Sequence, residues 1–362
     1  MNNTEIEQEK SNEIISSHKS LRYKGINYDV GTFTRGKSGP SSRDIFNPAQ
    51  VKKEMRIIKN DLHCNSIRIS GMDIERLTLA SEYALMEGLE VWFSPANVDA
   101  DENETIDYFI ECAKAAEKLR NEYNNIVFVT GCELTFFMKG LVLGETAFDR
   151  INTFMKPWTL LKSTILKGPF NKRLNNFLHI AVKTIRDNFH GEITYASGPW
   201  EDVNWSIFDN IGIDYYRDAM NKNRYRENLK KYFKHNKPVI ITEFGCCTYR
   251  GAEDKGSYGW AIVDTTKTPK QLKGEFIRDE NVQVRYITES LDIFTDEKID
   301  GAFVFTFINQ SYPYNENPLY DLDMAAYGIV KSYIDQMEKF YEGMPWEPKA
   351  SFKALAEYYK TI

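Results

Sequence analysis

Two hydrophobic rhythms alternate along the chain. Short apolar runs rich in β-branched residues, in which every second side chain faces the same way, predict strands. Longer segments with apolar residues three and four positions apart predict amphipathic helices. The predicted strands lie at 24–30, 65–70, 89–94, 126–133, 193–197, 208–215, 238–243 and 301–307. The predicted helices lie at 48–60, 74–87, 104–123, 173–188, 221–235, 281–295, 326–341 and 350–360.

This order of elements predicts a single-domain (β/α)8 TIM barrel. Eight strands that alternate with helices fit a closed parallel barrel, although an open doubly wound sheet also alternates. The first strand is not followed by the glycine-rich G-x-G-x-x-G turn that a dinucleotide-binding sheet would carry there. No internal repeat and no linker rich in Pro, Gly or Ser divides the chain. We therefore expect one barrel over 21–362, behind a flexible segment at 1–20.

Three long segments interrupt the alternation, at 138–172, 248–277 and 309–324. Long loops on the active face of a barrel usually shape the site or form a partner surface. All three contain aromatic residues, whose rings either pack in a core or stack on flat ligands such as sugars. Both uses remain open from the sequence.

Charge and cysteine content narrow the classes of function. The 362 residues carry a formal net charge of −6. Binding to nucleic acid or to an anionic membrane normally needs a basic face, so this net charge argues against both. The five cysteines, an odd number without a C-x-x-C pair, indicate reduced thiols. Because no apolar run has the length of a signal or a membrane span, we expect a cytoplasmic protein.

Two glutamates close predicted buried strands. Glu133 ends the fourth strand, and Glu243 ends the seventh. A carboxylate at the end of a buried strand must find hydrogen-bond partners or stay partly protonated. Two such groups at one barrel mouth suggest an acid and a base that face one another. The alternative is that each glutamate caps a strand end or forms an ion pair there.

Other polar and aromatic residues lie at the predicted ends of the remaining strands. Because all strands of a barrel open on the same face, the residues that follow them build one site. Arg68 and Tyr215 come from the second and sixth strands. The predicted substrate-binding residues are Asn27, Tyr28, Asn97, Cys132, Trp200, Tyr216, Phe307 and Asn309.

These motifs resemble glycoside hydrolase clan A, the retaining β-glycosidases that include cellulases, mannanases, xylanases and β-galactosidases. Residues 241–245 (ITEFG) are similar to the nucleophile strand of the clan. Residues 67–69 (IRI) look like its second strand, and 209–216 (DNIGIDYY) resemble its sixth. The segment 320–330 is similar to the run into the final helix of such enzymes.

The resemblance implies a role for four residues. Glu133 corresponds to the general acid/base of the clan and Glu243 to its nucleophile. Arg68 corresponds to the arginine that supports the nucleophile, and Tyr215 to the tyrosine that donates a hydrogen bond to it. The resemblance further implies a carbohydrate or glycoside substrate and no cofactor.

The chain departs from the clan at two positions. The clan usually places an asparagine directly before the acid/base, where it binds the sugar 2-hydroxyl, and this chain has Cys132 there. A thiol is a much weaker hydrogen-bond partner than an amide. The eighth strand of the clan commonly ends in tryptophan, whereas this chain has Phe305 and Phe307. A non-hydrolytic glycan- or protein-binding barrel and a transglycosylase therefore stand as alternatives to a hydrolase.

The chemistry of the glutamate pair follows from charge alone. Retaining cleavage needs two carboxyls about 5 Å apart, one protonated and one ionised. A guanidinium and a phenol that donate to Glu243 would favour its anion, and that anion would keep Glu133 protonated. Cys132, Cys246 and Cys247 lack the paired spacing of zinc ligands, and no histidine follows a predicted strand, so we expect no metal.

Overall fold

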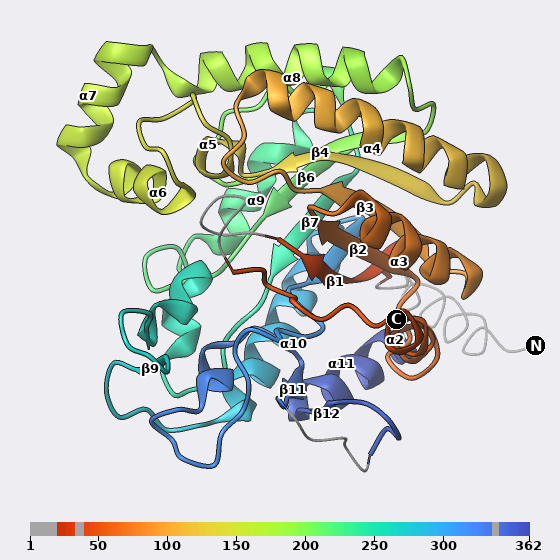
Figure 1. The fold of residues 1–362 in the computed structure, drawn as a ribbon, viewed down its shortest axis with the longest axis vertical. Helices are drawn as coiled ribbons and strands as arrows, with labels where there is room; N and C mark the ends of the chain where they lie inside the picture. The colour runs from red at the N-terminus through yellow and green to blue at the C-terminus, as the bar shows by residue number, and fades with distance from the viewer. Residues whose placement is uncertain (1–19, 33–39, 335–339) are drawn as a thin grey trace, which may run out of the picture.

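The protein forms a closed barrel of eight parallel strands surrounded by helices (Figure 1). The structure is a computed structural model, and it describes residues 20–32, 40–334 and 340–362. Around the barrel the strands follow the order β1-β10-β7-β6-β5-β4-β3-β2. The predicted (β/α)8 TIM barrel is therefore confirmed as a single domain. The predicted flexible segment at 1–20 lies, up to residue 19, outside the described residues.

All eight predicted barrel strands are present. Each pairs in parallel with the next strand along the chain, and β10 pairs with β1 to close the ring. Their bounds are β1 Tyr23–Gly31, β2 Ser66–Gly71, β3 Glu90–Pro95, β4 Ile126–Cys132, β5 Glu192–Ser197, β6 Ile211–Asp214, β7 Val239–Phe244 and β10 Gly301–Val304. Strand β6 is shorter than the predicted 208–215.

Four of the barrel helices, α2, α3, α4 and α10, begin at an Asn or Asp whose side chain caps them. Asn47 caps α2, which has proline in its first turn, and Asp101 forms a capping box with Glu104 at the start of α4. The helices that cover the barrel are α2 Pro48–Asn60, α3 Ile74–Met86, α4 Glu102–Tyr123, α8 Phe170–Arg186, α9 Tyr225–Phe233, α10 Glu280–Asp296 and α11 Ala350–Thr361.

The segment after β4 holds helices that the hydrophobic pattern did not resolve. Residues 138–172 contain α6 Ala147–Met155 and α7 Pro157–Lys167, preceded by the short α5 Leu134–Phe137. Helices α6 and α7 lie together at the upper left of Figure 1, away from the ring of strands. Residues 248–277 fold into 3-10 turns and a small β8–β9 hairpin (Val263–Asp264 with Gln271–Leu272). Residues 309–324 enter a 3-10 turn at Leu322–Ala325.

The helix predicted at 326–341 is wrong over the residues that the structure describes. Strand β11 Val330–Ser332 lies there instead and pairs antiparallel with β12 Trp346–Pro348. The backbone N–H groups of Ile329 and Val330 donate to carbonyls at the end of the eighth strand, which a helix would not allow. Helix α11 therefore follows the eighth strand as the last helix of the barrel.

Side chains alternate between the inside of the barrel and its outer wall. The inside is filled by an aromatic and β-branched cluster centred on Trp92, which packs against Tyr23 at 5.5 Å and Phe303 at 4.9 Å between ring centroids. A larger core lies between the strands and the helices. This parity decides which residue of each strand end reaches the mouth.

The seam between β1 and β10 is covered by the C-terminal helix. The hydroxyl of Tyr359 donates to the carbonyl oxygen of Gly25 at 2.9 Å and to that of Ala302 at 3.3 Å. The ammonium of Lys24 donates to the carbonyl oxygen of Tyr359 at 2.7 Å. Strands from the two ends of the chain are thus held by one helix. None of the described helices is long and apolar enough to cross a bilayer.

Candidate active site

A cavity of about 520 Å³ opens where the barrel strands end. Its lining comes from strand ends and from the long segments that follow them. Both Glu133 and Glu243 line it, so the two strand-end glutamates reach one hollow.

Glu133 lies on a sharp turn between β4 and α5. Its backbone is in the left-handed region at φ +42°, two residues after Gly131 at φ +84°. Two hydrogen bonds hold the turn: the N–H of Glu133 donates to the Ala196 carbonyl at 2.8 Å, and the N–H of the next residue, Leu134, donates to the hydroxyl of Tyr195 at 2.8 Å. A left-handed non-glycine residue is costly and persists only where its surroundings fix it.

A buried carboxylate fixes those surroundings. Glu201 accepts four hydrogen bonds, from the N–H and hydroxyl of Thr135, the hydroxyl of Tyr195 and the N–H of Gly198, at 2.7 to 3.1 Å. The indole N–H of Trp200 donates to the hydroxyl of Thr135 at 2.9 Å. The turn that carries Glu133 and the aromatic wall beside it are therefore joined in one network. Glu201 was not predicted, because nothing in its sequence neighbourhood marks it as buried.

The electrostatic surroundings of Glu133 favour its protonated form. Burial raises the pKa of Glu133 well above the ordinary value, and the negative charges of Asp214, Glu243 and Glu201 raise it further. Arg68 opposes these effects only in part. A protonated carboxyl in a cavity can give a proton to an oxygen atom bound there.

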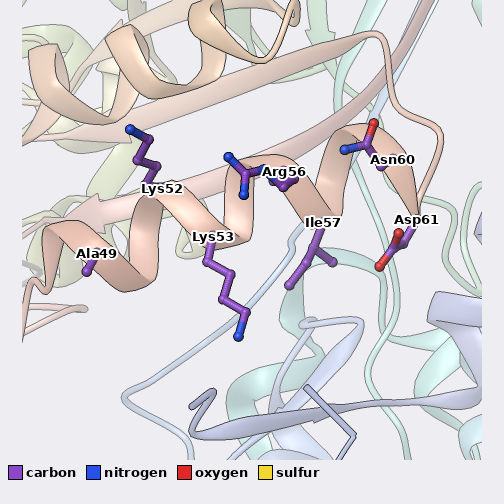
Figure 2. A pocket seen from close by; sticks show the side chains of 7 residues that line it. All are labelled: Ala49, Lys52, Lys53, Arg56, Ile57, Asn60 and Asp61. Atoms are coloured by element: carbon purple, nitrogen blue, oxygen red, sulfur yellow. The ribbon is translucent and has the colours of Figure 1, made fainter. Parts of the chain in front are cut away.

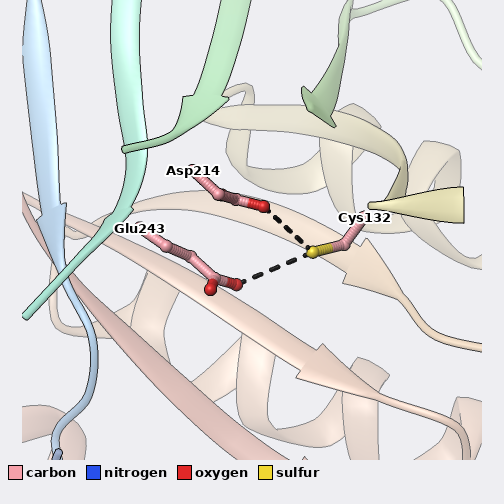
Figure 3. Close-up of side chains that lie close together, drawn as sticks. All are labelled: Cys132, Asp214 and Glu243. Atoms are coloured by element: carbon pink, nitrogen blue, oxygen red, sulfur yellow. Dashed lines mark hydrogen bonds between the residues drawn. The ribbon is translucent and has the colours of Figure 1, made fainter. Parts of the chain in front are cut away.

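Glu243 instead has a guanidinium and a phenol as donors, and the thiol of Cys132 lies 3.7 Å from its Oε1 (Figure 3). The guanidinium of Arg68 donates to its Oε1 at 2.8 Å, and the hydroxyl of Tyr216 donates to its Oε2 at 3.2 Å. Arg68 is itself fixed by Ser94, whose hydroxyl accepts from its Nε at 3.2 Å, and by the carbonyl of Thr242. A buried guanidinium beside one oxygen neutralises an ionised carboxylate and fixes its orientation.

A third carboxyl lies beside the pair. Asp214 ends β6, is buried, and lies 3.6 Å from the Arg68 guanidinium. Its Oδ1 accepts from the hydroxyl of Thr242 at 2.7 Å, and its Oδ2 accepts from the thiol of Cys132 at 3.2 Å (Figure 3). Burial, followed by the charge of Glu243, raises the pKa of Asp214 to about 8. The carboxyls of Glu133, Asp214 and Glu243 therefore surround the single buried guanidinium of Arg68, and of the three only Glu243 accepts a hydrogen bond from it.

The predicted role of Tyr215 is wrong, and its neighbour lies in its place. The hydroxyl of Tyr215 donates to the carbonyl of Tyr225 at 2.8 Å on the outer wall, and the Tyr225 hydroxyl returns a bond to the Tyr215 carbonyl. Tyr216, one position later, faces inward and contacts Glu243. The reason is strand parity: Asp214 faces in, so Tyr215 must face out.

Tyr28 and Phe307 do not belong to the predicted substrate site. Tyr28 is buried on the outer wall, where its hydroxyl donates to Glu54, because adjacent residues of β1 point to opposite faces. Phe307 packs against Tyr28 and against Trp346 at ring-centroid distances of 6.1 and 5.2 Å. It lies beyond the end of β10 at Val304, so strand parity does not set its direction. Neither residue lines the cavity, and both predictions are wrong.

Asn27 faces the barrel interior but lies beneath the cavity. Its amide donates to the carbonyls of Thr242 at 3.0 Å and Phe303 at 3.3 Å. It is buried and is not part of the cavity lining. The prediction that Asn27 binds substrate is therefore wrong, because its amide ties β7 to β10.

The other predicted binding residues do line the cavity. They are Asn97, Cys132, Trp200, Tyr216 and Asn309. The sequence left the aromatic residues of the three long segments between core packing and stacking on a ligand, and four of them, Phe148, Tyr258, Trp260 and Tyr312, line the cavity. Phe305, from the end of the eighth strand, and Tyr327 complete this aromatic wall.

Cys132, Asp214 and Glu243 bring three potential metal-ligand atoms within 4.8 Å of one another. The residues do not fit a cation well. Burial and the adjacent carboxyls raise the pKa of the Cys132 thiol well above the ordinary value, so it stays a protonated donor, and Arg68 already provides a positive charge. Cys246 and Cys247 lie in a different core cluster. The cluster in Figure 3 is a hydrogen-bond network.

A second hollow, of about 430 Å³, lies on the outer surface of α2 (Figure 2). Lys52, Lys53 and Arg56 line it, together with Ala49, Ile57, Asn60 and Asp61. It contains neither an inward-facing carboxyl pair nor an aromatic wall. The barrel mouth is therefore the candidate active site.

In fold, the chain is similar to solved glycoside hydrolases. A GH113 β-1,4-mannanase shares 15% sequence identity over 95% of this chain and 100% of its own, with a TM-score of 0.60. The GH113 β-mannanase from Alicyclobacillus acidocaldarius shares 13% identity over 94% of this chain and 98% of its own, at 0.57. A glycoside hydrolase family 5 enzyme from Prevotella bryantii B14 shares 12% identity over 94% of this chain and 96% of its own, at 0.50.

No protein-family model matches the sequence, and no curated protein is similar to it in sequence. At this level of identity the comparison establishes the fold. That fold is the TIM barrel, as the order of strands and helices in the sequence led us to expect.

Proposed function

We propose that the protein is a retaining β-glycoside hydrolase, with Glu133 as general acid/base and Glu243 as nucleophile. The observation that carries the proposal is the asymmetry of two carboxyls in one cavity. Glu133 is surrounded by negative charge and burial, whereas Glu243 accepts from Arg68 and Tyr216. One group is thus prepared to give a proton and the other to attack.

In the first step an oxygen of Glu243 attacks the anomeric carbon. The bond from that carbon to the leaving oxygen breaks, and Glu133 transfers its proton to that oxygen. The product is a glycosyl ester on Glu243 and an ionised Glu133. Arg68 donates to Oε1 of Glu243 and Tyr216 to Oε2, so whichever oxygen attacks, the other oxygen keeps one donor and the ester stays in place.

In the second step Glu133 acts as a base. It removes a proton from water, the water oxygen bonds to the anomeric carbon, and the ester bond to Glu243 breaks. Both glutamates return to their starting protonation states. Two inversions at one carbon leave the configuration unchanged.

The lining of the cavity supports a saccharide. Trp200 and the aromatic residues of the long segments offer flat apolar faces, and Asn97 and Asn309 offer amide groups. Sugars bind through this combination of stacking and hydrogen bonds. The two GH113 neighbours are described as β-mannanases, so a β-mannoside is the first substrate to test.

All five cysteines are free, and four of them are buried. Buried free thiols suit a reducing compartment. A cytoplasmic location is therefore part of the proposal.

Azide rescue tests the two roles separately. With a dinitrophenyl β-glycoside, Glu243→Ala should lose turnover by at least a thousandfold, and azide should restore it with formation of an α-glycosyl azide. Glu133→Ala should accumulate the glycosyl-enzyme, and azide should release a β-glycosyl azide. The stereochemistry of each azide is read by proton NMR.

Glu145→Ala, which removes an exposed carboxylate, is the control and should turn over like the unmodified protein. Unchanged turnover in both cavity variants would refute the assignment. If a panel of glycosides gives no turnover but calorimetry detects saccharide binding, the protein is a binder. Sugar transfer to an added saccharide in preference to water would identify a transglycosylase.

A further inference from the structure

Helix α7 presents its apolar residues to solvent. Trp158 is 83% exposed, Ile165 is 74% exposed and Leu161 is 50% exposed. Their spacing of three and four residues places them on one side of the helix. Leu166 of α7 is also exposed, and so is Met155, the last residue of α6, two positions before α7 begins. We call these five residues the α7 face.

The opposite side of α7 is turned inward and holds two hydroxyl residues beside the half-buried Leu160. Ser163 is buried, and its hydroxyl accepts a hydrogen bond from the N–H of Leu143 at 3.1 Å. Thr164 is half-buried and donates to the carbonyl of Leu160 at 3.0 Å. A surface helix normally turns its apolar stripe to the core. In α7 the most apolar side faces away from the core, and the described residues of the chain leave it uncovered.

The charges around the α7 face have one sign. Lys156, Lys162, Lys167 and Lys172 are all exposed, and no Asp or Glu occurs between residues 150 and 186. The chain as a whole carries −6. Among the residues that the structure describes, exposed lysines and exposed large apolar side chains thus occur together on α7 and next to it in the chain.

The α7 face lies beside the candidate active site. Helices α6 and α7 pack on one another, and Phe148 and Ile151 of α6 line the cavity. The hydroxyl of Tyr258, from the cavity wall, contacts the sulfur of Met155 at 3.4 Å. Figure 1 shows α7 as an outlying part of the fold on this side. Whatever covers α7 therefore comes close to the mouth of the barrel.

We propose that α7 docks on the surface of an anionic lipid bilayer, with Trp158, Leu161 and Ile165 inserted at the interface and the lysines over the headgroups. A helix that lies in a membrane interface has this composition, with Trp and Leu on one face and Lys beside it. The cytoplasmic leaflet is negatively charged, and each nearby lysine strengthens binding to it. A net charge of −6 argues against binding to an anionic membrane only if the charges are spread evenly over the surface, and here lysines are grouped around α7.

A bilayer explains the α7 face better than a second copy of the chain does. The helix has 11 residues and is therefore about 16 Å long, which offers less area than a stable dimer buries. Two copies would also bring lysines against lysines. A bilayer supplies apolar depth and the opposite charge together.

Co-sedimentation with lipid vesicles tests the proposal on the full chain, independently of any glycosidase activity. The protein should pellet with vesicles that contain phosphatidylglycerol and much less with phosphatidylcholine alone. The pair Trp158→Ser and Ile165→Ser should weaken binding at least tenfold. The pair Lys162→Glu and Lys167→Glu should weaken it by at least tenfold as well, since each lysine contributes about fivefold.

Two controls match these changes elsewhere on the surface. Met86→Ser removes an exposed apolar side chain of α3, and Lys118→Glu with Lys360→Glu makes the same change in net charge. Both should bind vesicles like the unmodified protein. All substituted side chains are exposed, so melting temperatures should stay unchanged. Absence of pelleting with anionic vesicles, or equal binding by the α7 variants and the controls, would overturn the proposal. So would a dimer in solution that Trp158→Ser with Ile165→Ser dissociates.

Discussion

Tyr215 and Tyr216 are neighbours in the chain and point to opposite sides of the barrel wall. Tyr215 bonds to α9 through Tyr225, and Tyr216 contacts the carboxylate of Glu243. A single residue step therefore separates a packing role from a place in the site. At this scale, chemistry depends on which of two similar side chains the strand turns inward.

The two tyrosines give a matched pair of variants. Tyr216→Phe should lower kcat by about 10- to 100-fold, because it removes a donor to Glu243 and leaves the ring in place. Tyr215→Phe should leave kcat nearly unchanged and cost about 1 kcal/mol of stability, since it loses one buried hydrogen bond. Steady-state kinetics and urea unfolding measure both. A larger loss of kcat in Tyr215→Phe would contradict the assignment.

Asp214 predicts a stability that depends on pH. Its pKa is raised from 3.8 to about 8 in the folded protein, so folding favours the protonated form. The stability from this group is complete below pH 4 and is lost as pH rises through 8. Asp214→Asn removes the ionisation. As pH rises from 4 to 8, the free energy of unfolding of the unmodified protein should therefore fall by up to about 4 kcal/mol relative to that of Asp214→Asn.

Urea unfolding of both proteins across that pH range measures the difference. If the difference in free energy of unfolding between the two proteins is the same at every pH, the pKa of Asp214 does not change on folding. Glu145→Gln, which replaces an exposed carboxylate outside this network, is the control for the substitution itself.

Elements set the geometry that single residues use. The turn from β4 into α5 holds Glu133 in a left-handed conformation, and the neighbouring β5 and the loop after it supply Tyr195 and Glu201. The turn that carries Glu133 is thus stabilised by the carboxylate of Glu201, which lies 201 − 133 = 68 residues further along the chain.

Glu201→Gln tests this support. An amide cannot accept at both ends, so one pair of the four donors loses its acceptor and meets an N–H group. We expect a loss of about 3 kcal/mol in the free energy of unfolding. Activity should fall as well, because the turn under Glu133 loosens. Urea unfolding and kinetics check both effects, and unchanged stability would show that the network does not hold the turn.

The whole molecule depends on closing the barrel between its first and last strands. Tyr359 of α11 spans this seam through the carbonyls of Gly25 and Ala302, whereas Tyr358 donates to Asp292 on the surface. Closure by long-range contacts makes the barrel one cooperative unit.

These two tyrosines also make a matched pair. Tyr359→Phe should lower the free energy of unfolding by about 1 to 2 kcal/mol, because two buried carbonyls lose a donor. Tyr358→Phe should change it by less than about 0.5 kcal/mol, since its hydroxyl is at the surface. Equal effects in urea unfolding would argue against a special role for the seam.

The sequence by itself determined the alternation of strands and helices, and hence the barrel, because apolar periodicity reports local burial. It also located Glu133, Glu243 and Arg68, because the rule that strand ends share one face needs only strand order. The inward and outward sense of each strand end depended on the tertiary structure. Tyr28 and Tyr215 lie one residue away from inward-facing positions, and Phe307 lies beyond the end of β10, so strand order alone did not give their directions.

Only the tertiary structure brought Asp214 and Glu201 to the catalytic pair and placed the aromatic wall. These contacts join segments that are distant in sequence, and no local pattern encodes them. The α7 face belongs to the same class: its apolar spacing was visible in the chain, but periodicity does not say whether a stripe faces a core or a solvent. In the folded protein the side of α7 that carries Ser163 is buried, and the side that carries Trp158 is exposed.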